Sequence, residues 1–319
     1  MNRKSIVKTI FKSAEWTIFA VVVIIVSLAF YLVQPVKSNR VLFLPAGTGA
    51  TIIAYLHRSG IDANGLDRYL LRFFGYPQQG WIDIGTTCLT KADFLYRLTH
   101  AKAAMTKVKL IPGETRVIFF DQLARTLKLD PKKLDNAYRR YAPYPDGVIW
   151  PDTYFVPMGI TEEHLVYHLI KRSMARHERL SKKFFGTYNE KKWFRYVTIA
   201  SIIQKEAADT REMPLVSAVI YNRMKKGMPL QMDGALNYGK YSHVKVTKRR
   251  IDEDMSRFNT YKYTGLPPSP VGSVSLDAIK AAIKPANVDY LYFVKGKNGK
   301  HIFTKRYKTH LRNIKSVNK

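Results

Sequence analysis

The chain has 319 residues, 46% of them apolar and 13% aromatic, which is enough for two domains with hydrophobic cores and too apolar for a disordered chain. Lys and Arg number 53 against 24 Asp and Glu, a net charge of +29. Such an excess suits an anionic partner such as nucleic acid, lipid head groups or a wall polymer, and a general bias toward basic residues would produce it equally well.

A membrane anchor is predicted near the N-terminus. Residues 17–33 read TIFAVVVIIVSLAFYLV, an uncharged apolar run with Trp16 and Tyr31 near its ends. The run has about the length that spans a bilayer. No small-residue cleavage signal follows it, so we expect an uncleaved transmembrane helix over 17–34 rather than a signal peptide.

The charges beside this run predict its orientation. Four basic residues precede it: Arg3, Lys4, Lys8 and Lys12. The positive-inside rule therefore places the tail 1–16 in the cytoplasm and the chain after the anchor outside it. The sequence holds no second run of this length, which predicts a single-pass protein and argues against nucleic acid as the partner.

Two later segments resemble each other. VLFLPAGTGATIIAYL begins at Val41 and VKLIPGETRVIFFDQLA begins at Val108, and Pro45 corresponds to Pro112. In each, a short apolar strand is followed by a Pro/Gly turn and a helix-period stripe, which predicts a β-α unit. A polysaccharide-binding module would fit, but strand–turn–helix is common and the pattern by itself favours plain packing units.

Helices are expected around Leu66–Phe74 and Lys91–Thr99, and over most of 130–185. The segment 142–159, APYPDGVIWPDTYFVPMG, interrupts the last of these. Its prolines break helices, so we expect a turn or extended chain there.

Cysteine and histidine usage gives no sign of a metal site. Cys88 is the one cysteine, so it cannot form an intrachain disulfide, and we expect it to be a small core residue. The eight histidines lack paired-ligand spacing. We therefore expect no metal and no cofactor.

The C-terminal part begins with a long helix predicted over 190–206. A second helix follows, with Pro214 suited to its first turn and Gly227 to its C-terminal end. Short strands and turns are expected after it, including a hairpin within 291–304 that turns at Asn298–Gly299. The part of the chain outside the membrane is thus predicted to be α+β.

The long helix carries an acid in an unexpected position. Ile199, Ile202 and Ile203 share one face, and Glu206 continues their stripe. Burying an ionised carboxylate is costly unless it is paired, and desolvation raises its pKa. A carboxyl group that is protonated near pH 7 can act as a general acid, as the glutamate of lysozyme does.

The competing interpretation is that Glu206 forms an ion pair with a nearby Arg or Lys, such as Arg211 or Arg223, or emerges at the end of the helix. Periodicity alone favours this interpretation. Downstream polar segments shift the balance. Gln231 and Asp233 stand at alternate positions and share one face if the chain is extended. More amides, hydroxyls and rings follow: Tyr238, Asn259, Thr260, Tyr261 and Tyr263. Together they suit a carbohydrate cleft, because they offer hydrogen bonds to hydroxyls and flat faces to sugar rings.

Several segments carry a family resemblance: ASIIQKEA, IYNRMKKGMPLQMDGALNYG, FNTYKYTGLPPSP, YLYFVKGKNGKHIFT and DGVIWPDTY. The order of the apolar span, LPAG and IPGE along the chain adds to it. Over essentially the whole chain they resemble the endolytic murein transglycosylases, the MltG or YceG-like family. The resemblance implies a single N-terminal transmembrane helix in the inner membrane and a LysM-like β-α module over 38–107. It further implies a second β-α and helical region over 108–185, and a periplasmic, mixed α/β catalytic domain over 186–319 with the catalytic acid on a helix.

The resemblance also implies an activity. The family cleaves the β-1,4 bond between N-acetylmuramic acid and N-acetylglucosamine within nascent glycan strands, leaves 1,6-anhydro-N-acetylmuramic acid ends and limits strand length. By motif the catalytic acid is Glu206. The expected substrate-binding residues are the family's pocket positions together with Tyr238: Gln231, Asp233, Tyr238, Asn259 and Tyr261. The implied partners are peptidoglycan glycan strands, inner-membrane lipids and peptidoglycan synthases, without nucleic acid.

One acid fits this chemistry better than two. A lytic transglycosylase uses the C6 hydroxyl of the sugar as the nucleophile, so Glu206 can protonate the leaving oxygen and then accept the hydroxyl proton. Asp233 is then expected to orient the substrate. The chain departs from the family at Gln204, at Gly234, where a proline is usual, and at Ser273–Ser275. These departures predict a looser cleft around an unchanged acid.

Two other hypotheses stay open. The chain could be a non-catalytic, membrane-anchored peptidoglycan-binding protein, although the joint presence of Glu206, Gln231, Asp233 and Asn259 argues against it. It could also be a membrane-tethered nucleic-acid binder that uses the +29 charge. The last hypothesis requires a cytoplasmic C-terminus.

Overall fold

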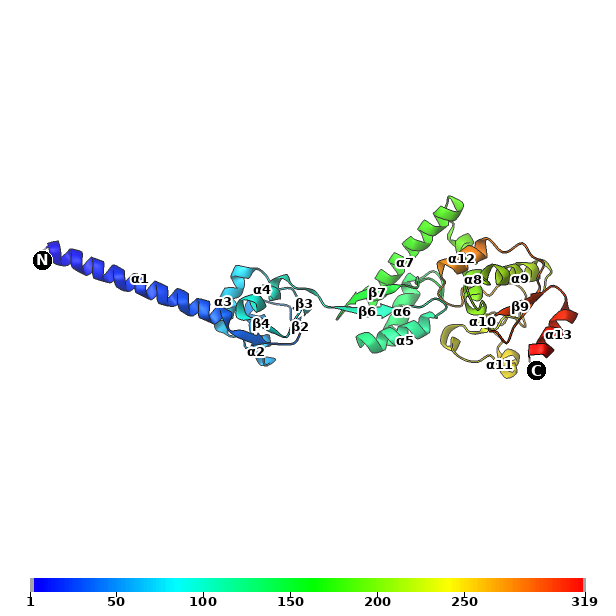
Figure 1. Ribbon diagram of the computed structural model, residues 1–319, viewed down its shortest axis with the longest axis horizontal. Helices are drawn as coiled ribbons and strands as arrows, with labels where there is room; N and C mark the ends of the chain where they lie inside the picture. Colours follow the sequence, from blue (N-terminus) through cyan, green and yellow to red (C-terminus); the bar gives the residue numbers. More distant parts are fainter. Residues whose placement is uncertain (1–2, 318–319) are drawn as a thin grey trace. The chain divides into compact units, whose positions relative to one another are not determined.

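The structure is a computed structural model that describes residues 3–317. The chain divides into two compact units, whose elements are labelled in Figure 1. The first unit comprises the residues up to Thr106 together with Pro157–Gly159. The second comprises Lys107–Val156 and the chain from Ile160 onward.

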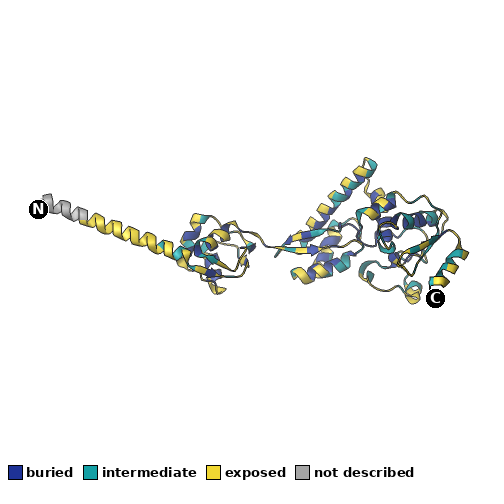
Figure 2. Ribbon diagram, viewed as in Figure 1, coloured by how far each residue is buried: buried dark blue, intermediate teal, exposed yellow. Residues whose placement is uncertain are grey.

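The first unit starts with α1 (Arg3–Val33), one continuous helix. Its segment Lys12–Val33, with 22 residues, is the one described helix that is long and apolar enough to cross a membrane. Figure 2 shows this segment as exposed along most of its length, the pattern expected of a helix covered by lipid rather than by protein. Side chains are described from residue 12 onward, which leaves three of the predicted basic residues outside the described side chains: Arg3, Lys4 and Lys8.

After α1 the first unit folds as short strands and helices. In chain order they are β1 (Pro35–Lys37), β2 (Val41–Leu44), α2 (Gly49–Arg58), α3 (Gly65–Phe74), β3 (Gly80–Asp83), β4 (Cys88–Thr90), α4 (Lys91–His100) and β5 (Lys102–Ala103). β1 pairs with β4, and β2, β3 and β5 form a three-stranded antiparallel sheet. Leu28 and Leu32 of α1 pack against the hydrophobic core of this unit. The C-terminal end of α1 is therefore part of the folded unit.

The second unit contains most of the helices. From β6 onward the elements are β6 (Met105–Lys109), α5 (Arg116–Leu127), α6 (Pro131–Tyr141), β7 (Thr153–Pro157), α7 (Glu162–Phe185), α8 (Glu190–Glu206), α9 (Met213–Lys225), α10 (Asp233–Leu236), a short 3-10 helix (Gly239–Tyr241), α11 (Lys248–Glu253), α12 (Leu276–Ile283), β8 (Tyr292–Lys295), β9 (His301–Thr304) and α13 (Tyr307–Val317). β6 pairs with β7, and β8 pairs with β9. The mixed α/β composition agrees with the α+β prediction.

Both predicted β-α units are present, since β2 leads into α2 and β6 leads into α5. The long helix and the C-terminal hairpin also lie where the sequence predicts them, with Gly299 at φ 79° in the hairpin turn. Two expectations were wrong. Cys88 is exposed, because it falls on the open side of the two-stranded β1–β4 sheet. The chain after Gly227 is not only strands and turns, because it contains α11, α12 and α13.

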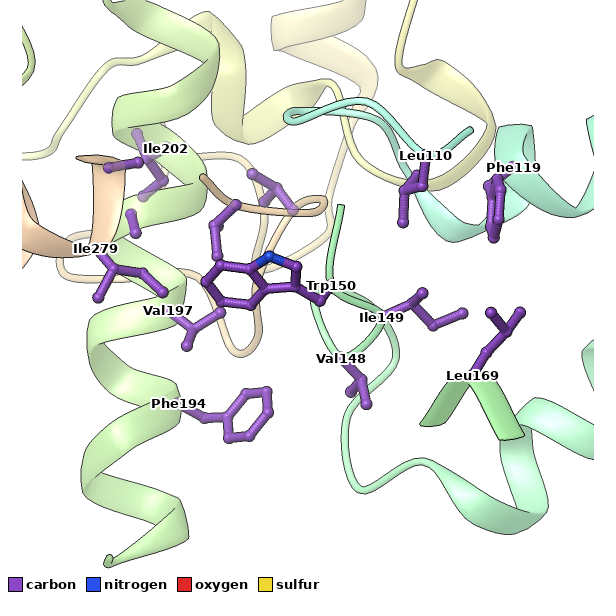
Figure 3. Packing of buried hydrophobic residues seen from close by; sticks show 14 of the residues in the cluster. Leu110, Phe119, Val148, Ile149, Trp150, Leu169, Phe194, Val197, Ile202 and Ile279 are labelled. Atoms are coloured by element: carbon purple, nitrogen blue, oxygen red, sulfur yellow. The ribbon is translucent and has the colours of Figure 1, made fainter. Parts of the chain in front are cut away.

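One hydrophobic core runs through the second unit. Figure 3 shows its centre, where the Trp150 ring faces Val197 and Ile279. Its neighbour Ile149 points to the other side, toward Leu169. The segment DGVIWPDTY therefore lies in the core and packs against α8 on one side and α7 on the other.

This core also joins the two regions predicted as separate from the sequence, 108–185 and 186–319. The indole N–H of Trp193 on α8 donates to His177 Nδ1 on α7 at 3.0 Å, and His177 Nε2 bonds to the Val148 carbonyl at 3.0 Å. Burial lowers the pKa of His177 to about 4, so its ring is neutral and suits both bonds. The residues on either side of position 185 fold as one unit.

Candidate active site

Glu206 is the last residue of α8. The helix ends there because Ala207 leaves the helical conformation, with φ −68° and ψ 134°. Three residues of the apolar stripe are at most 1% exposed: Ile199, Ile202 and Ile203. Their burial, worth about 1.5–3 kcal/mol each, fixes which way the last turn of α8 faces. The predicted stripe therefore delivers the carboxyl group of Glu206 to a defined place.

The Glu206 carboxyl group is half-buried. Burial raises its pKa to about 7; the backbone N–H of Gly234 opposes that rise, and the negative charge of Asp233 adds to it. The Gly234 N–H donates to Glu206 Oε1 at 2.6 Å. A carboxyl group with a pKa near 7 is protonated in a large fraction of molecules at neutral pH, which is the state a general acid requires.

The two expected ion-pair partners of Glu206 have other partners. Arg211 pairs with Asp209, with its Nη2 2.7 Å from Asp209 Oδ2. Arg223 is buried and donates to the carbonyls of Leu291 and Leu230, at 2.7 Å in each case. The ion-pair interpretation of Glu206 was therefore wrong.

A cavity of about 430 Å³ opens at Glu206. Its lining comes from α8, α9, α10, β8, α13, the 230–231 segment and the loop that contains Tyr261: Glu206, Arg223, Leu230, Gln231, Asp233, Tyr261, Phe293, Val294, Tyr307, His310, Leu311 and Ile314. Gln231, Asp233 and Tyr261 of the predicted site thus share one cavity with the acid. The mixture of carboxyl, amide and aromatic groups can bind a polar ligand with flat apolar faces.

Gln231 and Asp233 reach the cavity by a different route from the extended one that the sequence favoured. Gln231 has φ 49°, a left-handed conformation that is uncommon outside glycine, and Asp233 begins α10. Arg223 holds this turn, because its Nη1 donates to the Leu230 carbonyl at 2.7 Å and lies 3.3 Å from Gln231 Oε1. Strained backbone of this kind costs about 1–3 kcal/mol and persists only where surrounding contacts enforce it.

Tyr261 and Asn259 have different surroundings. The Tyr261 hydroxyl donates to Asp233 Oδ1 at 2.6 Å. Burial and then this hydrogen bond raise the pKa of Tyr261 well above its usual value, so the hydroxyl stays a donor. Asn259 is fully buried and does not line the cavity; its amide donates to the carbonyls of Ile251 and Asp254, both at 2.8 Å, and accepts from the Tyr261 N–H. Asn259 thus shapes the backbone that presents Tyr261.

Tyr238 lies apart from the Glu206 cavity. Its ring stacks on Phe258 with centroids 4.4 Å apart, and its hydroxyl donates to Asp254 at 3.3 Å. It lines a separate cavity of about 450 Å³ together with Arg250 and Glu253. The structure does not bring Tyr238 to the acid.

The C-terminal helix α13 is part of the site that sequence reasoning missed. Four of its residues line the cavity: Tyr307, His310, Leu311 and Ile314. The His310 ring stacks on Tyr292 of β8 with centroids 5.2 Å apart. The spacing of Tyr307, Leu311 and Ile314 is helical, and this signal could have revealed the helix although not its location.

The departures from the family pattern are held by hydrogen bonds. Gln204 Oε1 accepts from the Ser275 N–H at 3.2 Å, and the Ser273 N–H donates to the Glu114 carbonyl at 2.9 Å. Gly234 is buried, and a Cβ there would lie 2.8 Å from Lys205 Cβ and 2.9 Å from Glu206 Oε1. Close packing and hydrogen bonds thus surround each of these positions, and the looser cleft stays a prediction.

Curated proteins similar to this chain share one name. The endolytic murein transglycosylase of Bacillus subtilis (strain 168) is 34% identical over 167 residues, which are 52% of this chain and 46% of that protein. The endolytic murein transglycosylase of Streptococcus pneumoniae serotype 2 (strain D39 / NCTC 7466) is 34% identical over 177 residues, which are 53% of this chain and 31% of that protein. The match spans less than half the length of either relative.

The fold and the family agree. A solved structure of a YceG-like protein from Listeria monocytogenes superposes with a TM-score of 0.55, covering 86% of this chain and 99% of that one at 23% identity. A sequence model of the YceG-like family matches residues 44–316. This match includes the predicted acid and all of the predicted substrate-binding positions, so the chain belongs to the YceG-like family.

Proposed function

We propose that the chain is an endolytic lytic transglycosylase that cleaves the MurNAc-β-1,4-GlcNAc bond within peptidoglycan strands. The observation that carries the proposal is the half-buried Glu206, whose pKa is raised to about 7 and which shares a cavity with Asp233 and Tyr261. The name of the curated relatives supports the same activity. The match covers less than half of each relative, so the proposed reaction rests on the residues of this chain's own site.

The proposed reaction uses one carboxyl group twice. Protonated Glu206 donates its proton to the bridging oxygen as the C1–O bond breaks, which releases the leaving sugar as an alcohol. The Glu206 carboxylate then accepts the proton of the C6 hydroxyl while that oxygen bonds to C1. The product is a 1,6-anhydro sugar, no water is consumed, and Glu206 ends protonated as it began. Intramolecular attack supplies the nucleophile by proximity.

The other cavity residues are proposed to orient the sugar. Asp233 already accepts a hydrogen bond from Tyr261, and its negative charge helps to keep Glu206 protonated. Gln231 offers an exposed amide at the cavity wall. Asn259 is proposed to position Tyr261 from beneath, and Tyr238 to contact a part of the glycan outside this cavity.

The first unit is proposed to be a LysM-like module that holds the same glycan. A groove of about 470 Å³ on this unit contains the rings of Phe43, Tyr55 and Trp81 beside small polar residues. The centroid of the Phe43 ring lies 5.4 Å from that of Trp81 and 6.0 Å from that of Tyr55. Clustered rings with polar neighbours suit the apolar face and the hydroxyls of a sugar.

The proposed setting is the outer side of the cytoplasmic membrane. α1 would cross the membrane with the N-terminus in the cytoplasm, and the second unit would lie in the periplasm beside nascent glycan strands. Anionic lipids and peptide-stem carboxylates would complement the net charge of +29. Peptidoglycan synthases are the proposed protein partners, because they make the nascent glycan strands whose length this cleavage would limit.

Product analysis tests the proposal. The full-length protein is incubated with purified peptidoglycan, and fragment ends are identified by mass spectrometry, with Glu206→Gln as the test variant. Asp209→Asn is the matched control, because it removes a nearby acid that pairs with Arg211 outside the cavity. We expect internal fragments with anhydro ends from the native protein and the control, and none from Glu206→Gln.

Each other outcome rejects a defined part of the proposal. Reducing ends in place of anhydro ends would make water the nucleophile and Asp233 a catalytic partner. Intact glycan that is bound but uncut by the native protein would support the alternative, a non-catalytic membrane-anchored peptidoglycan-binding protein.

A further inference from the structure

Helix α3 of the first unit exposes an apolar face that no described segment covers. Three side chains at helical spacing form it: Leu66 at 45%, Tyr69 at 52% and Phe73 at 86% exposure. Tyr76, just beyond the end of the helix, adds a fourth exposed ring at 96%. The opposite face holds the buried Asp67, Leu70 and Leu71. Exposed apolar side chains in a row, rather than singly, mark an interaction surface. We name this set of four the α3 stripe.

The start of α3 is fastened to the end of α1. The Tyr31 hydroxyl of α1 donates to Asp67 Oδ1 at 2.8 Å and accepts from the side-chain N–H of Asn64 at 2.9 Å. Asn64 caps α3, and Asp67 completes its capping box. The Lys91 ammonium group lies 3.3 Å from Asp67 Oδ2, and both side chains are at most 1% exposed. This network places the first turn of α3 beside the end of α1, as Figure 1 shows.

The length of α1 then places α3 at the bilayer. The segment Lys12–Val33 has 22 residues, about 33 Å of helix at 1.5 Å per residue. A hydrocarbon core is about 30 Å thick, so nearly all of this segment is needed to cross it. Leu28 and Leu32, which pack on the first unit, lie only about 24 and 30 Å from Lys12. The unit is therefore attached to α1 at the edge of the hydrocarbon and not beyond a stalk.

We propose that the α3 stripe lies in the interfacial layer of the bilayer that α1 crosses. Tyr side chains favour this layer, because their rings are apolar and their hydroxyls can reach water. Amphipathic helices with aromatic and basic residues lie in the same plane. Arg68 and Arg72, on the same helix, would meet lipid phosphates. The inference rests on the proposed membrane anchor and adds a second contact that restricts how the first unit can turn about α1.

Fluorescence quenching in protein-free vesicles tests this surface with lipid as the one available partner. The full-length protein carries Cys88→Ser, and a single cysteine bears an environment-sensitive fluorophore at position 73. Position 102, exposed on β5, is the matched control within the same unit. Position 24, near the middle of the segment Lys12–Val33, reports insertion. Nitroxide-labelled lipid and aqueous iodide are the two quenchers.

We expect lipid nitroxide to quench the label at position 73 at least threefold more strongly than the label at position 102, with iodide showing the reverse order. If the label at position 24 is in lipid while that at position 73 is as open to iodide as the control, the α3 inference fails and the anchor stands. If the label at position 24 is itself open to iodide, the proposed anchor fails and the inference with it.

Discussion

The backbone N–H of Gly234 donates a hydrogen bond to Glu206 Oε1 over 2.6 Å. This contact joins the end of α8 to the start of α10 and opposes the rise in the Glu206 pKa that burial causes. The family resemblance predicts proline at this position, and proline has no N–H to donate. Gly234 therefore contributes directly to the environment of the acid.

Two replacements of Gly234 are expected to distinguish the effect of close packing at this position from the effect of its N–H hydrogen bond to Glu206. Gly234→Ala keeps the N–H but places a Cβ 2.8 Å from Lys205 Cβ and 2.9 Å from Glu206 Oε1, so we expect a stability loss of about 1–3 kcal/mol and a lower kcat. Gly234→Pro removes the donor as well, so the apparent pKa in the pH–rate profile should rise. Gly65→Ala is the control, because its Cβ meets open space. An unchanged apparent pKa in Gly234→Pro would contradict the role given to this bond.

Activity is expected to fall as the pH rises through about 7. Glu206 must be protonated to act as the acid, and its pKa is raised to about 7. Above that value kcat/KM should drop about tenfold per pH unit. A pH–rate profile between pH 5 and 9 with defined glycan strands checks this. A rate that stays constant up to pH 9 would rule out Glu206 as the proton donor.

The same titration predicts a pH-dependent stability difference. Glu206 binds a proton more tightly in the folded chain, since its pKa is raised from 4.5 to about 7, so its favourable contribution is complete below about pH 4.5 and is lost as the pH rises through 7. Glu206→Gln stays neutral throughout. We expect the variant to be more stable than the native chain at pH 8, on the order of 1–3 kcal/mol after allowance for partial exposure, and nearly equal at pH 4.5. Urea unfolding at both pH values measures this, and a gap that is larger at pH 4.5 would refute the assignment.

Loss of the Tyr261 hydroxyl is expected to reduce activity without unfolding the protein. Tyr261→Phe removes the 2.6 Å hydrogen bond to Asp233, and such bonds to charged groups contribute about 1.5–3 kcal/mol. We expect a roughly tenfold to hundredfold loss in kcat/KM. Tyr263→Phe is the control, because that hydroxyl bonds to the Met255 carbonyl and lies outside the cavity. Equal losses in both variants would show that the effect is not specific to the cavity.

The residues of α13 that line the Glu206 cavity are expected to contribute to substrate binding rather than to the chemical step. Ile314 lines the cavity, and α13 has no buried residue of its own. Ile314→Ser should therefore raise KM with little change in kcat and little loss of stability. Lys308→Ser, on the same helix but outside the lining, should leave KM unchanged. A fall in kcat with an unchanged KM in Ile314→Ser would place the helix in the chemical step instead.

Local patterns in the sequence were enough to predict several elements. The apolar period placed α8, and the Asn298–Gly299 turn placed the β8–β9 hairpin, because both depend on contacts within a short stretch of chain. The stripe of isoleucines also predicted that Glu206 would face an apolar surrounding. Motif resemblance, rather than period, selected Asp233 and Tyr261, which do lie in its cavity.

Other features depend on contacts between residues far apart in the chain, and local patterns do not encode them. The sequence offers Arg223 as an ion-pair partner for Glu206. In the fold, the guanidinium group of Arg223 instead donates hydrogen bonds to the carbonyls of Leu230 and Leu291. Asn259 was predicted to bind the sugar. Its side-chain amide instead donates to the backbone carbonyls of Ile251 and Asp254 in a buried turn.

The sequence by itself determined that this protein has a long apolar N-terminal helix, an α+β remainder and an acid at the end of an apolar helix. The tertiary structure alone decided the environment of that acid. It brought the Gly234 N–H, the Asp233 charge and the wall of α13 to Glu206 from separate segments. The physical reason is that a pKa depends on desolvation and on charges within a few ångströms, whereas periodicity reports only which face of one helix a residue occupies.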